Sequence, residues 1–142
     1  MTRRVLLLGC GAHGKAALHD LVSADESTHV VVADGDRGIE ATTRQYPASR
    51  VATKVVDATN ETAVAALMRE ADVVVEALPG PFALPMARLA AGCGVSIVSS
   101  MYLRDPQETD AGRMAATPPI EPAGISSVRW PGKCLGSLAA AS

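Results

Sequence analysis

The chain has 142 residues, of which 48% are hydrophobic and only 3% aromatic, so one domain with an aliphatic core is expected. Its 13 basic and 15 acidic residues leave a net charge of −2, which excludes a basic nucleic-acid footprint. No apolar run approaches the roughly 20 residues of a membrane span, so no membrane partner is expected.

The amino terminus and the cysteines both point to a cytoplasmic protein. The apolar run before Gly9 has four residues, fewer than the roughly 7–15 of a signal peptide. Cys10, Cys93 and Cys134 are odd in number and lack metal-ligand spacing, so a reducing compartment and no metal site are expected.

Apolar segments predict five strands, at residues 5–8, 30–33, 51–56, 72–77 and 95–98, of which the first two are expected to be buried. Patterns of period 3.6 and end signals predict helices between them, at residues 12–23, 38–46, 60–71 and 85–91. Thr59 or Asn60 is expected to cap the third helix, and Gly92 and Gly94 to end the fourth. This alternation predicts an α/β fold, a Rossmann-type doubly wound parallel sheet of about five strands that is apparently incomplete.

Three glycines follow the first predicted strand at the spacing G-x-G-x-x-G, namely Gly9, Gly11 and Gly14. Gly9 would allow the tight turn, Gly11 the close approach of a pyrophosphate, and Gly14 the packing of the helix against the sheet. The helix start at Ala12 and His13 would offer unpaired N–H groups to phosphate. For His13 itself, a surface role and a phosphate contact both remain open.

Asp34 ends the second predicted strand, twenty residues after Gly14. Its carboxylate could accept hydrogen bonds from both hydroxyls of an adenosine ribose, which favours NAD. NADP remains the alternative, because Arg37 could partly offset the charge that repels a 2′-phosphate. Asp36 is expected to cap the next helix, which would leave Asp34 free for the cofactor.

The other strand ends supply further candidate cofactor contacts, because ligands of such sheets bind at the carboxyl ends of the strands. Asp57 and Ala58 follow the third strand on the adenine side, although Asp57 is equally compatible with a simple turn. Leu78, Pro79 and Ser99 follow the fourth and fifth strands and would border the nicotinamide half.

Residues 104–142 differ in composition and periodicity from residues 1–103, the predicted cofactor domain. They are rich in Pro, Ala, Gly and Ser and are expected to be largely irregular. Only residues 105–114 fit a short helix, and residues 125–130 a short strand.

Several segments together resemble the cofactor domain of the saccharopine dehydrogenase-like family, which includes saccharopine reductases and lysine 6-dehydrogenases. They are residues 5–14, 31–34, 55–59, 71–82 and 90–100. The Asp-Val-Val-Val-x-Ala-Leu-Pro and Gly-Val-x-x-x-x-Ser segments are more specific than the glycine motif.

The resemblance implies an NAD(P)-binding domain of an oxidoreductase that transfers hydride at the C–N bond of an amino acid. The family's substrate domain lies downstream and is not matched after about residue 110. The chain is therefore expected to be truncated and inactive alone, and no catalytic residue is assigned. A regulatory NAD-sensing module without turnover is the alternative function. An exposed sheet edge would also permit a homodimer.

Overall fold

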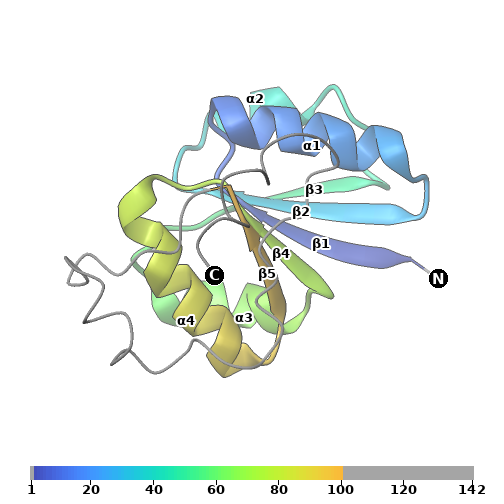
Figure 1. Cartoon of the computed structure of the whole chain (residues 1–142). Helices are drawn as coiled ribbons and strands as arrows, with labels where there is room; N and C mark the ends of the chain where they lie inside the picture. Colours follow the sequence, from blue (N-terminus) through green and yellow to red (C-terminus); the bar gives the residue numbers. More distant parts are fainter. Residues whose placement is uncertain (1, 101–142) are drawn as a thin grey trace, which may run out of the picture.

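The computed structural model describes residues 2–100, which form one sheet covered by helices (Figure 1). The helix and strand expected at residues 105–114 and 125–130 lie outside the described residues. Within residues 2–100, no helix has the length and apolar content needed to cross a membrane.

The sheet has five strands in the order β3-β2-β1-β4-β5, and every neighbouring pair is parallel. The strands are β1 (Arg3–Leu8), β2 (Thr28–Asp34), β3 (Val51–Val55), β4 (Val73–Glu76) and β5 (Ser96–Ser99). This arrangement confirms the predicted Rossmann-type α/β fold, and each predicted strand matches an observed one to within about two residues.

Helices cover both faces of the sheet, as Figure 1 shows. Helices α1 (Ala12–Ala24) and α2 (Ile39–Thr43) lie on one face. Helices α3 (Glu61–Arg69) and α4 (Ala83–Cys93) lie on the other, and the short 3-10 helix η1 (Gly80–Phe82) precedes α4.

The central strand β1 is buried on both faces, as its continuous apolar run predicted. Val5 and Leu7 belong to the core under α1 and α2, whereas Leu6 and Leu8 belong to the core under α3 and α4. All four side chains are at most 4% exposed. Burial of each contributes about 1.5–3 kcal/mol to stability, which anchors the strand that carries the glycine motif.

The helix ends partly follow the sequence signals. Asn60 caps α3 as expected, because its side-chain oxygen accepts a hydrogen bond from the Ala63 N–H at 3.1 Å. Gly94 ends α4 in the left-handed conformation (φ +70°), whereas Gly92 lies within that helix instead of ending it.

The expected cap of α2 is wrong by two residues. Gly38 occupies the N-cap position, and no side chain caps this helix. The Asp36 carboxylate accepts a hydrogen bond from the Gly38 N–H at 2.8 Å, so it orders the turn before the helix. The side chain thus satisfies its own local turn, a common competitor of capping for aspartate.

Candidate functional site

The strand order reverses between β1 and β4, and the loops that follow these strands lie side by side. The chain runs outward from β1 through β2 to β3 and returns to β4 on the other side of β1. The Ala77 N–H then donates to the Leu8 carbonyl at 2.8 Å. Such a reversal opens the crevice in which open α/β sheets bind ligands.

Gly9 is required both by conformation and by space. Its φ of +86° lies in a region that other residues rarely adopt. A Cβ at this position would lie 2.8 Å from the Ala77 carbonyl oxygen and 3.1 Å from the Leu78 side chain. The glycine therefore brings the turn after β1 directly against the loop after β4.

Gly14 touches the glycine turn more closely than it touches the sheet. A Cβ on Gly14 would lie 2.1 Å from the Gly9 carbonyl oxygen, and only 3.8 Å from the Ala77 side chain. The sequence led us to expect contact between the helix and the sheet. The structure shows that this glycine mainly allows α1 to begin directly over the turn.

Gly11 has open space beside it, in contrast to the other two motif glycines. A Cβ there would meet no atom of residues 2–100 within 4 Å. Gly11 is the N-cap of α1, no side chain caps this helix, and its first turn holds no acidic residue. The exposed first-turn residues Ala12 and His13 therefore carry N–H groups that lack helical partners. Shape and charge both fit a phosphate.

Asp34 contacts the glycine turn, so the expectation of a free carboxylate is wrong. One carboxylate oxygen accepts a hydrogen bond from the Cys10 N–H at 2.7 Å. The other accepts from the Asp36 N–H at 2.8 Å. Each oxygen retains acceptor capacity, because a carboxylate offers about four lone-pair sites. Asp34 therefore stabilises the turn and keeps acceptor sites that neither of these hydrogen bonds uses.

Cys10 is packed as a small buried side chain within the turn. Burial raises the pKa of its thiol, and the negative charge of Asp34 raises it further. The thiolate, which is the reactive form, is therefore disfavoured.

Asp57 stabilises its own turn after β3. Its carboxylate accepts from the Thr59 N–H at 2.8 Å and from the Thr59 hydroxyl at 2.7 Å. These hydrogen bonds, the backbone one first, lower the pKa of Asp57. Ala58 is half-buried in the same turn. Both residues lie beyond β2, on the side of Asp34 away from the glycine motif.

Glu76 is a buried carboxylate that the sequence analysis did not single out. It is 0% exposed at the end of β4. One of its oxygens accepts from the Leu78 N–H at 2.7 Å, and the other accepts from the Ser99 hydroxyl at 2.5 Å. The sequence signal that could have identified it is a charged residue directly after the Val-Val-Val run of a predicted strand. It joins the candidate residues Leu78 and Ser99, and Pro79 follows Leu78 on the exposed surface.

Burial raises the pKa of Glu76 above its ordinary value of 4.5, although the hydrogen bonds from Ser99 and Leu78 act in the opposite direction. The folded protein therefore binds this proton more tightly than the unfolded chain does. This contribution to stability is complete below pH 4.5 and is lost as pH rises towards the raised pKa.

The Gln side chain of Glu76→Gln does not titrate, so this variant does not lose stability in the way that the wild type does as pH rises. Its free energy of unfolding should therefore rise relative to that of the wild type between pH 4.5 and neutrality. Urea titrations of both proteins at several pH values measure the difference. Carboxylates with a lowered pKa, such as Asp57, are present in both proteins, so their effects on stability cancel in this difference. A difference that stays constant with pH would contradict the raised pKa.

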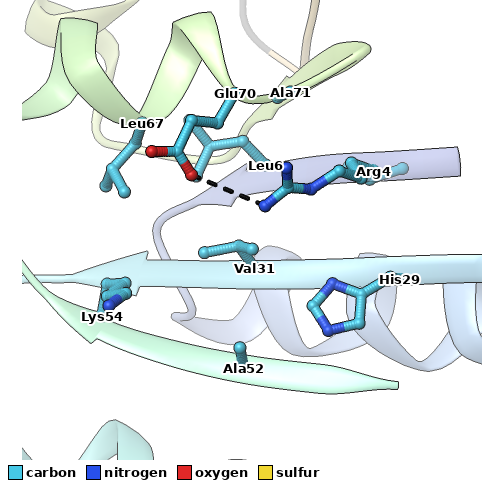
Figure 2. Close-up of a pocket in the computed structure, with 10 residues that line it drawn as sticks. Arg4, Leu6, His29, Val31, Ala52, Lys54, Leu67, Glu70 and Ala71 are labelled. Atoms are coloured by element: carbon cyan, nitrogen blue, oxygen red, sulfur yellow. Dashed lines mark ion pairs between the residues drawn. The ribbon is translucent and has the colours of Figure 1, made fainter. Parts of the chain in front are cut away.

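A separate hollow of about 220 Å³ lies beside α3 on the opposite side of β1 and β2 from α1 (Figure 2). Figure 2 shows Val31 and Ala52 on its sheet side, and Leu67 above them. The ion pair between Arg4 and Glu70, 3.5 Å long, lies at its rim. Exposed pairs of this kind contribute little to stability. The hollow contains no residue of the glycine motif and is not part of the crevice.

Comparison with known proteins gives one family and a set of similar folds. The model of the saccharopine dehydrogenase NADP binding domain matches residues 5–118. Saccharopine dehydrogenase (L-Glu forming) from Saccharomyces cerevisiae is 25% identical, with a TM-score of 0.64 over 73% of this chain. The match covers 22% of the yeast chain, so this chain spans about a fifth of that protein.

Two further structures share the fold at lower identity. The WlbA dehydrogenase from Chromobacterium violaceum, in complex with NADH and UDP-GlcNAcA, is 16% identical with a TM-score of 0.58 over 72% of this chain and 28% of its own. A short-chain dehydrogenase/reductase from Veillonella parvula, in complex with NADP, is 14% identical with a TM-score of 0.54 over 70% of this chain and 47% of its own.

Proposed function

Because the chain belongs to the saccharopine dehydrogenase NADP-binding domain family, we propose that its glycine turn binds the pyrophosphate of a nicotinamide dinucleotide. The observation that carries the proposal is the space beside Gly11, which no atom of residues 2–100 fills, at a helix start that none of their side chains caps. A glycine that no protein atom crowds is explained when a ligand takes the room of its missing Cβ.

The proposed contacts follow the order of the strands. The N–H groups of the motif would hold the pyrophosphate, and this set comprises Gly9, Gly11, Ala12, His13 and Gly14. Asp34 would accept the adenosine ribose, with Asp57 and Ala58 on the adenine side. Leu78, Pro79 and Ser99 would border the nicotinamide half. When bound, the dinucleotide supplies hydride transfer, and these residues bind and orient it.

We further propose that the reaction served is oxidoreduction at the C–N bond of an amino acid. The 25% identity with the yeast saccharopine dehydrogenase supports this reaction class. Within residues 2–100, the strand ends at the crevice would supply cofactor contacts, and no histidine side chain there has a hydrogen-bond partner, so we assign the substrate contacts to other segments. Residues 1–103 are accordingly proposed as the cofactor domain.

Titration calorimetry of the 142-residue chain with NADH, and then with NADPH, tests the proposal. Binding with a Kd in the micromolar range, about 1 μM or above, is expected for at least one of them. ADP-ribose should compete with it, since it carries the same pyrophosphate. Absence of binding to both cofactors, with a folded circular dichroism spectrum, would refute the proposed function.

Replacement of Asp34 by serine should shift the preference between the two cofactors. Loss of the carboxylate removes its repulsion of a 2′-phosphate, and it frees the Cys10 and Asp36 N–H groups. The affinity for NADPH relative to NADH should rise about tenfold, equivalent to ~1.4 kcal/mol. Asp36→Asn is the matched control, because it removes the same charge two residues away. An unchanged ratio would exclude Asp34 from the ribose site.

A further inference from the structure

The carboxyl ends of β4 and β5 are tied together by one fully buried side chain. Glu76 accepts hydrogen bonds from the Leu78 N–H at 2.7 Å and from the Ser99 hydroxyl at 2.5 Å. Its main-chain carbonyl also accepts from the Ser100 N–H, at 3.3 Å. A single residue therefore fixes both the loop that leaves β4 and the end of β5.

Burial of this carboxylate costs free energy, and other contacts already pair the neighbouring strands. Removing a carboxylate from water is unfavourable unless its oxygens find donors. Ladder hydrogen bonds and buried apolar side chains such as Val74 and Ile97 already hold β4 to β5. The Glu76 side chain instead bonds to the main chain of Leu78, two residues beyond the end of the strand.

Leu78 in turn lies against the glycine turn. The position of a Cβ on Gly9 is 3.1 Å from the Leu78 side chain and 2.8 Å from the Ala77 carbonyl oxygen. The carboxylate, the β4 loop and the glycine turn therefore form one continuous set of contacts. Movement of Leu78 would change the wall of the crevice on its β4 side.

We propose that Glu76 is a positioning residue for the nicotinamide half of the bound dinucleotide, acting through Leu78 and Ser99. The inference rests on the proposed function. The adenosine half would lie over β2 and β3, beyond Asp34, and that part of the crevice has no contact with Glu76. Rossmann sheets consist of two mononucleotide-binding halves, and a dinucleotide lies across both of them. Loss of the Glu76 hydrogen bonds should therefore affect one half of the ligand selectively.

A carboxamide can replace this carboxylate, whereas a thioether cannot. In Glu76→Gln, the amide oxygen accepts from Leu78 and the amide nitrogen donates to Ser99, whose hydroxyl rotates to accept. Glu76→Met has a similar volume and provides no comparable acceptor. Glu76→Asp is shorter by one methylene. It can keep the bond to Leu78, as Asp34 does to the residue two positions on, but it cannot reach Ser99.

The test is calorimetry of NADH and of ADP with the 142-residue wild type and the variants. ADP carries the adenosine and the two phosphates of NADH but lacks its nicotinamide riboside. We expect Glu76→Gln to bind both ligands within about twofold of the wild type. Glu76→Met should lose about tenfold in NADH affinity, the value of one hydrogen bond to a charged group, with ADP affinity unchanged. Far-UV circular dichroism and thermal melting confirm that each variant is folded.

Three outcomes would overturn the inference. Glu76→Met losing both ligands equally would mean a general structural role, and unchanged NADH binding would mean no role. A loss in Glu76→Gln as large as in Glu76→Met would show that hydrogen-bond geometry is not what matters. Should Glu76→Met not fold, Glu76→Asp takes its place, with an expected loss of about threefold for NADH alone. Wild type that binds neither ligand would instead refute the proposed function itself.

Discussion

Replacement of Gly14 by alanine should abolish the folded state. The new Cβ would lie 2.1 Å from the Gly9 carbonyl oxygen and 2.8 Å from the Gly9 carbonyl carbon, both of them backbone atoms. Gly9 cannot yield, because its N–H donates to Ala33 at 2.9 Å and its own position is fixed against Ala77. We expect a loss above about 4 kcal/mol, a large part of the stability of a small domain.

Circular dichroism melting and urea titration measure this loss. The matched control is Gly92→Ala, in the last turn of α4, where a Cβ meets no atom of residues 2–100 within 4 Å. That substitution should stabilise the protein by up to about 1 kcal/mol through helix propensity. A Gly14→Ala protein that melts within a few degrees of the wild type would contradict the observed approach of α1 to the turn.

Replacement of Gly11 by valine should abolish dinucleotide binding and leave the fold intact. The backbone at Gly11 is extended (φ −70°, ψ −157°), which valine tolerates, and the surrounding space is open. The added methyl groups would occupy the room proposed for the pyrophosphate. We expect the affinity for NADH to fall by more than about 100-fold, or ~2.7 kcal/mol.

Calorimetry and a thermal melt separate the two effects of this variant. Gly92→Val serves as the control, because it adds the same side chain at an equally open position far from the turn. The control should bind NADH as the wild type does. Retained NADH binding by Gly11→Val would show that the ligand does not approach the backbone here.

The fold was predictable because its signals are local. The core of β1, β2 and β4 is a continuous apolar run. The turn after β1 is marked by glycines, and Gly9 adopts a positive φ that other residues rarely adopt. Capping was predictable at Asn60, where a single side chain decides the helix start. It failed at Asp36, because aspartate can also order the turn just before a helix, and sequence does not distinguish the two.

The sequence predicted that the candidate residues lie at the strand ends, but it did not predict the contacts that they make there. Asp34 was expected at the crevice, but its bond to Cys10 joins residues 24 positions apart. Glu76 pairs with Ser99, 23 positions away in sequence. Such contacts depend on which strands become neighbours and in what register, and a pattern read along one segment contains neither.

The central place of β1 also determines how the domain must assemble. All strand pairs within residues 2–100 are parallel, so none of them can form as a local hairpin. The neighbour of β1 on its other side is β4, which is distant in sequence. The Arg4 N–H donates to the Asp72 carboxylate across a separation of 68 residues. The chain must lose the entropy of closing this loop before burial of the core under α3 and α4 stabilises the fold. We therefore expect β1, α1 and β2 to associate early and β4 to dock late, in a slow folding reaction of milliseconds to seconds.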